Sequence, residues 1–133
     1  MSLTLDEAQK ALNAALAKAR EMNVKMAIAV VDDHGEVLAS ARMDGVQGWV
    51  IEMSRGKAMA SVFFRQLSGA LSERSNSPVF QGLNNIYGGK VVLAQGAVPI
   101  KRGDQVIGAV GAGGGKSVDD EEVAKAGVAA LSS

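Results

Sequence analysis

One lysine lies where a helix is predicted to bury its apolar face. When the segment from about Trp49 to Arg65 is placed on a helical wheel, Lys57 falls inside an apolar arc roughly 100° wide. The other residues of this arc are Val50, Met53, Ala60, Ser61 and Phe64. A lysine in such a place either extends along its stem to water or finds a carboxylate or carbonyl oxygens. Lys57 is therefore the strongest candidate in this sequence for a side chain with a chemical role.

Two roles are open to Lys57. In a structural role it forms a buried ion pair or contacts a helix terminus, and Asp44, just before the helix, is the expected partner. In a functional role it points into a pocket and presents a cation to an acidic or carbonyl-bearing ligand, with Arg42 as its companion.

The glycine-rich stretch Gly111–Gly115 is a second candidate, because it connects an apolar strand to a helix and such junctions often bind anions. Ser117 and Asp120 form a capping box that marks the helix start. Against anion binding, four acidic residues at positions 119–122 already satisfy the helix dipole and would repel a phosphate. Val110 stands where a P-loop requires glycine. We interpret the stretch as a hinge that supplies one wall of a pocket, through Gly111 and Gly113.

His34 is the only histidine and lies in a predicted turn, Asp33-His34-Gly35. A metal site needs several convergent groups, so a solvated imidazole is the default and no metal site is predicted. A single histidine can still ligate haem iron axially with a partner from another subunit. The absence of cysteine excludes disulfides and thiolate-ligated metals.

Composition limits the other function classes. A chain of 133 residues is expected to form one domain, spanning residues 1–133. Its formal charge of zero favours neither nucleic acid nor an anionic membrane as a partner. The longest apolar run, Met26–Val31, is too short to cross a bilayer, and no signal peptide is evident, so a cytoplasmic location is expected. With 47% hydrophobic residues, 4% aromatics and 16 glycines, a homo-oligomer is a reasonable outlet for surplus apolar surface.

The periodicities predict helices at both ends and in the middle of the chain, with short strands between them. Helices are expected over about residues 5–22, 49–65 and 118–131, the first of them capped by Thr4 with Glu7. Strands are expected over residues 24–32, 36–43, 90–95, 98–102 and 105–110. The irregular segment 66–89, with a short helix near residues 67–72, is expected to be functional or a subunit contact. Tight turns make the strands antiparallel, so the fold class is α+β with about five strands.

Several ordered motifs together resemble the GlcG/HbpS-like family, which also occurs as the C-terminal domain of PduO-type cobalamin adenosyltransferases. The motifs are Ala29–Leu38, Ala41–Gly45, Lys57-Ala58 with Ser61 and Phe63, Val98–Ile100, Ile107–Gly114 and Asp119–Gly127. The resemblance implies a profilin-like fold, oligomerisation, and an association with haem or corrinoids and with operons for glycolate, glycerol or diol use. Gln95-Gly-Ala-Val-Pro99 departs from the family's usual paired glycines, and Ala112 replaces a serine whose hydroxyl could have contacted a ligand.

Two function hypotheses from different classes follow. The first is an accessory protein that binds a small molecule, with haem or cobalamin as possible ligands. The residues expected around its pocket are Arg42, Asp44, Lys57, Ser61, Gly111 and Gly113. The second is an enzyme that acts on a small hydroxy acid or a diol-derived carbonyl compound through Lys57. Binding ranks first, because neither a nucleophile–base–orienter set nor a metal cluster is visible in the sequence.

Overall fold

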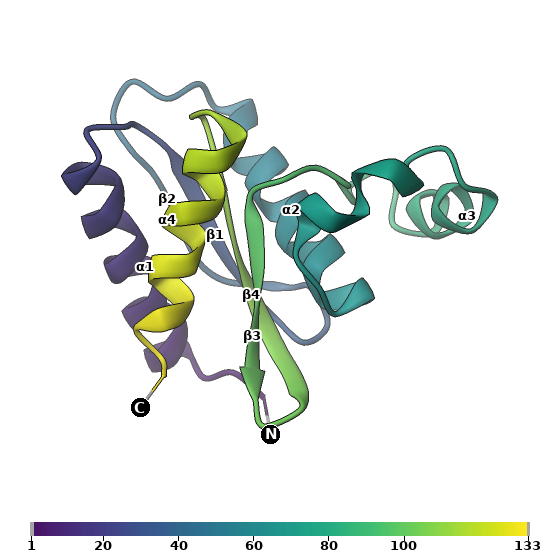
Figure 1. The fold of residues 1–133 in the computed structure, drawn as a ribbon, viewed down its shortest axis with the longest axis horizontal. Helices are drawn as coiled ribbons and strands as arrows, with labels where there is room; N and C mark the ends of the chain where they lie inside the picture. The colour runs from purple at the N-terminus through teal and green to yellow at the C-terminus, as the bar shows by residue number, and fades with distance from the viewer. Residues whose placement is uncertain (1, 133) are drawn as a thin grey trace.

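The computed structural model describes residues 2–132 and shows a four-stranded antiparallel sheet in the order β2-β1-β4-β3 (Figure 1). In chain order the elements are α1 (Leu5–Glu21), β1 (Ala27–Asp32), β2 (Val37–Arg42), α2 (Trp49–Phe64), the 3₁₀ helix η1 (Ser68–Arg74), α3 (Pro78–Ile86), β3 (Ala97–Arg102), β4 (Gln105–Gly113) and α4 (Ser117–Ala129). The predicted α+β class with antiparallel strands is confirmed.

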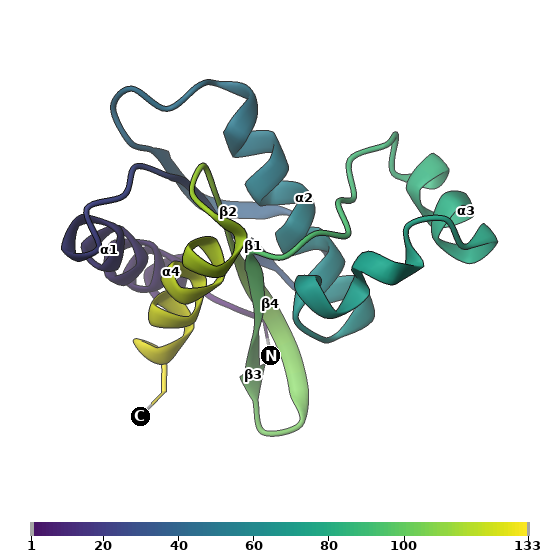
Figure 2. The same cartoon turned by 45° about the horizontal axis from the view of Figure 1, so that its top comes forward.

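Helices cover both faces of the sheet. Helices α1 and α4 pack side by side on one face and α2 on the other, as Figures 1 and 2 show. The alternation of side chains along a strand explains this layering. In β1, Ile28 and Val30 join the core under α1 and α4, whereas Val31 packs against Ala58 and Val62 of α2.

Small residues let the layers approach closely. Many buried positions are alanine, and Gly111 of β4 faces the backbone of α2 so closely that a Cβ there would lie 2.1 Å from the carbonyl oxygen of Ser54. Gly127 likewise permits the close approach of α4 to α1, because a Cβ there would lie 2.9 Å from the carbonyl oxygen of Ala11. This close packing fixes the position of α2 over β4.

The expected fifth strand is wrong, because residues 90–95 form no strand. Their backbone bonds elsewhere: Val92 N donates to Gly56 O at 3.1 Å and Val91 N to Asn84 Oδ1 at 2.9 Å. The side chains of Val91 and Leu93 are buried against the far end of α2. The apolar alternation here thus reflects packing onto a helix.

The segment 66–89 is more regular than predicted. It holds η1 in place of the short helix expected near residues 67–72, and α3, which was not predicted. Ser77 caps α3, accepting from Phe80 N at 3.1 Å, and Pro78 takes the first helical position. Figures 1 and 2 show α3 projecting away from the sheet. A helix of nine residues gives only a short apolar periodicity, and the surrounding serine, asparagine and proline residues are typical of loops.

The two expected capping boxes had different outcomes. Thr4 and Glu7 exchange the predicted hydrogen bonds at the start of α1. The prediction of a capping box at Ser117 is wrong, because Ser117 is already the first helical residue. Lys116 is the N-cap residue, and its side chain makes no capping hydrogen bond. The glycine stretch also differs from the prediction, because Gly111 and Gly113 belong to β4.

Within residues 2–132, no helix has the length and hydropathy of a membrane span.

Candidate functional site

Lys57 and Asp120 form a buried ion pair where three elements meet. Lys57 Nζ lies 3.4 Å from Asp120 Oδ2 and donates to the carbonyl oxygen of Ala112 at 3.0 Å. Only 9% of the lysine side chain and 4% of the aspartate side chain are exposed. The two residues come from the middle of α2 and the first turn of α4, and Ala112 from the end of β4. The structure therefore joins groups that are 63 residues apart in sequence.

The local fold explains why these groups meet. Gly111 brings α2 down onto β4, and the short connection after Gly113 places the start of α4 beside the strand end. Gly96 leaves room for the lysine side chain, since a Cβ there would lie 2.9 Å from both Cδ and Nζ of Lys57. Gly96 has a φ of +142°, a conformation that glycine adopts readily.

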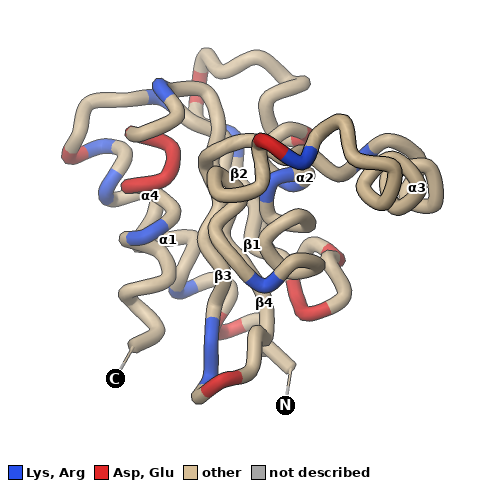
Figure 3. The backbone as a smooth tube through the Cα atoms, turned by 45° about the vertical axis from the view of Figure 1, so that its right-hand side comes forward, with Lys and Arg blue, Asp and Glu red and all other residues tan. Residues whose placement is uncertain are grey.

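Burial is the main influence on the Asp120 carboxyl and raises its pKa above the ordinary value. The charge of Lys57 and the N–H of Gly115, which donates to Asp120 Oδ1 at 2.9 Å, act in the opposite direction and only partly offset that rise. The neighbouring Asp119 adds a small further increase, and Figure 3 shows the acidic start of α4. The result is a carboxyl group that holds its proton more readily than a solvated one.

An open cleft of about 330 Å³ lies above this pair. Its lining residues are Trp49, Val50, Met53, Lys57, Ala94, Gln95, Gly113, Gly114, Gly115, Ser117 and Asp120. Trp49 is 62% exposed and Met53 is 37% exposed, so two large apolar side chains of the lining stay open to solvent. The site thus combines a polar buried floor with an apolar rim, the composition typical of a small-molecule site.

The structure separates the predicted site residues into groups. Lys57 and Gly113 line the cleft. Ser61, one turn beyond Lys57 on α2, is fully buried and its Oγ has no hydrogen-bond partner within residues 2–132. Gly111 packs against α2.

Arg42 and Asp44 line a different depression, of about 430 Å³, together with Leu16, Arg20, Lys25, Ala41 and Met43. The expected pairing of Lys57 with Asp44 is therefore wrong, because Asp120 is the carboxylate at Lys57. The fold supplies this carboxylate from the last helix and not from the segment that precedes α2.

Sequence reasoning missed Asp120, Trp49 and Gly96 as site residues. One signal for Asp120 was available: it stands three residues before Val123 and seven before Gly127, on the buried stripe of α4. A carboxylate on an apolar stripe needs a cationic partner when it is buried, and a buried lysine such as Lys57 needs an anionic one. The positions of Trp49 and Gly96 depend on tertiary packing, and no local pattern indicates them.

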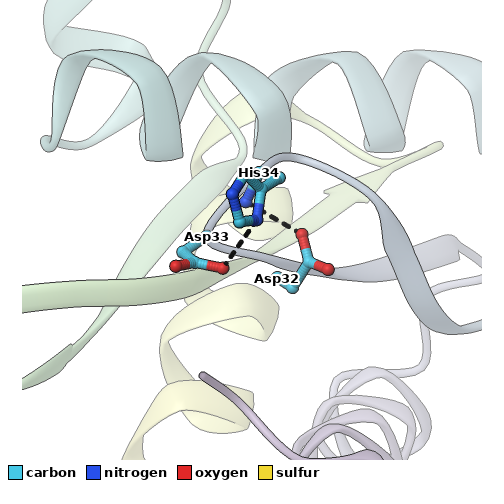
Figure 4. Close-up of side chains that lie close together, drawn as sticks. All are labelled: Asp32, Asp33 and His34. Carbon is cyan, nitrogen blue, oxygen red and sulfur yellow. Dashed lines mark hydrogen bonds and ion pairs between the residues drawn. The ribbon is translucent and has the colours of Figure 1, made fainter. Parts of the chain in front are cut away.

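His34 lies at the opposite end of the sheet from the cleft. Ala27 of β1 pairs with Gly113, whereas Asp32 at the other end of β1 pairs with Gly108 and leads into the turn at His34. Figure 4 shows the side chains of Asp32, Asp33 and His34 close together. One possible ligand atom of each lies within 4.8 Å of the others. Asp32 Oδ1 accepts from the backbone N–H of His34 at 2.9 Å and so helps to close the turn. The His34 side chain is 80% exposed.

The fold and the cleft define a small α+β domain with a candidate site where the central strand β4 ends, beside α2 and α4. The profile of the family described as haem degrading protein HbpS-like matches residues 3–129. The chain belongs to this HbpS-like family.

Two curated relatives are similar over nearly the whole chain. The first is an uncharacterised 15.0 kDa protein in the dhaT-dhaS intergenic region of Citrobacter freundii, 31% identical over 93% of this chain and 88% of that protein. The second is the corrinoid adenosyltransferase PduO of Citrobacter freundii, 27% identical over 98% of this chain. The chain spans only 39% of that PduO protein.

Solved structures share the fold. The crystal structure of HbpS superposes with a TM-score of 0.88 at 28% identity, covering all of this chain and 92% of that one. The crystal structure of a PduOC:heme complex gives a TM-score of 0.85 at 26% identity, covering 98% of this chain and 96% of that one. The predicted family resemblance is confirmed.

Proposed function

We propose that this chain is a tetrapyrrole-binding protein that takes haem or a corrinoid into the cleft above Lys57 and Asp120. The observation that carries the proposal is the combination of exposed Trp49 and Met53 with a buried ion pair beneath them. A tetrapyrrole needs apolar surface for its ring and polar partners for its side chains, which are carboxylates in haem and amides in cobalamin. The description of the family and the haem complex of a structural neighbour support this ligand class.

The residues of the cleft fit haem in a particular way. Trp49 offers a flat apolar face, and the thioether of Met53 is a donor that haem iron accepts. Lys57 has three N–H donors, of which the described contacts use two, so one is left for a ligand. His34, at the other end of the sheet, does not line this cleft. When bound, haem would supply its iron as the reactive centre.

An absorption titration with haem tests the proposal, using Trp49→Ala against Val79→Ala as a matched control. Both side chains are exposed, and Val79 lies on α3 outside the cleft. We expect a saturable Soret shift for the wild type and Val79→Ala, and weaker binding for Trp49→Ala, because stacking on an aromatic face is lost. Equal affinity for haem in all three proteins would show that haem does not bind in the cleft.

A second candidate function is an enzyme acting on a small hydroxy acid or a diol-derived carbonyl compound. The observation that favours it is a buried lysine beside an aspartate whose pKa is raised, an arrangement suited to proton transfer. Incubation with such compounds, followed by NMR, tests it. Turnover that Lys57→Met abolishes would support this candidate, and turnover unchanged in Lys57→Met would end it.

Three further expectations remain proposals. They are a homo-oligomeric state, a cytoplasmic location and a role in glycolate, glycerol or diol metabolism. The homo-oligomer is supported by exposed apolar side chains outside the cleft, among them Val79 and Ile86 of α3. The metabolic role follows from the family resemblance.

A further inference from the structure

A basic cluster lies close to the Lys57 cleft. It consists of Arg20 at the end of α1, Lys25 before β1 and Arg42 at the end of β2, all lining the depression of about 430 Å³. Within residues 2–132, none of the three forms an ion pair with an acidic side chain. Asp44 is the one carboxylate of the lining, so cations outnumber anions by three to one. Such a depression attracts an anionic group.

A third depression, of about 380 Å³, lies between this cluster and the cleft and shares lining residues with each. Lys25 lines both the basic depression and the middle one. Trp49, Val50 and Gly114 line both the middle one and the Lys57 cleft. The three depressions therefore adjoin one another in a row, which we call the groove, with cations at one end and Trp49 toward the other.

We propose, on the basis of the tetrapyrrole-binding function, that Arg20, Lys25 and Arg42 hold the carboxylates of the ligand while its ring lies along Trp49. Lys57 is less suited to this task, because its charge already faces Asp120. Arginine and lysine at the surface keep their donors free for carboxylates, and a guanidinium can bind one with two parallel hydrogen bonds. Arg42 also donates to the carbonyl oxygen of Val46, a lining residue of the middle depression, and this contact orients its guanidinium. The groove thus selects tetrapyrroles whose acid groups sit on one edge.

Binding of haem and of haem dimethyl ester, measured in the same dilute nonionic detergent, tests the proposal. The ester keeps the ring and the iron but lacks the two negative charges. Trp49 is the only tryptophan, so quenching of its fluorescence reports on occupancy of the groove. The proteins compared are the wild type, Arg42→Gln, Lys25→Gln with Arg42→Gln, and Lys10→Gln. Lys10 is an exposed residue of α1 outside the groove, which makes it the charge-matched control.

We expect haem to bind the wild type more tightly than the ester, with an affinity that falls as salt is added. Arg42→Gln should weaken haem binding about fivefold and the double variant more than about tenfold, as expected for partly solvated ion pairs. Binding of the ester should not change, and Lys10→Gln should match the wild type. Equal affinity for haem and ester, unaffected by the substitutions, would overturn the carboxylate site and leave the proposed function standing. If the wild type binds neither compound, the carboxylate site fails together with the haem form of the proposed function.

Discussion

At the scale of single residues, the central feature is the pairing of Lys57 with Asp120. Each is nearly inaccessible to water, so removing one partner leaves an uncompensated charge or a polar group without its bond. We expect Lys57→Met to lower the free energy of unfolding by about 3 kcal/mol. Adding Asp120→Asn should recover part of that loss. A double-mutant cycle from urea denaturation measures the coupling, and strictly additive effects would show that the two residues do not interact.

The same pair predicts how stability depends on pH. The pKa of Asp120 is raised in the folded state, so its contribution to stability is fully present below the unfolded value of about 3.8 and is lost as the pH rises through the folded value. Lys57 limits that rise, so its removal should raise the pKa of Asp120 further. We therefore expect Lys57→Met to be less destabilised, relative to wild type, near pH 4 than near pH 7. Urea denaturation at both pH values checks this, and a larger loss near pH 4 would contradict it.

The sequence indicated half of this site. A lysine on the apolar arc of a helix can be identified from periodicity alone, and Lys57 is buried as that pattern requires. Its partner could not be assigned from spacing, because Asp120 reaches it only through the packing of α4 against the end of β4. The same limit explains why Arg42 and Asp44, close to the helix in sequence, line a neighbouring depression. A ligand-binding role for all six predicted residues stays a prediction.

At the scale of elements, the close approach of α2 to β4 positions the site. We expect Gly111→Ala to lower the free energy of unfolding by about 2 kcal/mol or more, because a Cβ would meet the Ser54 carbonyl oxygen and push the layers apart. Gly82→Ala is the matched control, since a Cβ at that position of α3 would meet no atom within 4 Å. That change should be neutral or stabilising by about 1 kcal/mol, from helix propensity. Thermal or urea unfolding compares them, and equal effects would refute the packing argument.

The elements themselves were largely predictable from periodicity and turn chemistry. Helices α1, α2 and α4 and strands β1 to β4 occupy the expected segments, with ends shifted by a few residues. The exceptions have physical causes. Residues 90–95 alternate like a strand but pack on α2, and Gly111 to Gly113 continue β4 because glycine there permits contact with a helix.

At the scale of the whole molecule, α3 is the element that favours self-association, because large apolar side chains are exposed on it. It projects from the sheet, and residues 75–89 carry no charged side chain, in keeping with the tan tube around the α3 label in Figure 3. Val79 and Ile86 are 77% and 78% exposed. We expect sedimentation equilibrium to give a mass above that of the monomer, and Val79→Asp with Ile86→Asp to lower it. A monomeric wild type would contradict the homo-oligomer.

The most direct test of the account is a haem titration of the wild-type protein, followed at the Soret band and by Trp49 fluorescence together. Because Trp49 lines the cleft, we predict that both signals saturate at the same ratio of haem to protein. A parallel titration with cobalamin, followed at the corrin bands, covers the other tetrapyrrole class. No spectral change with haem and none with cobalamin would contradict the tetrapyrrole-binding function.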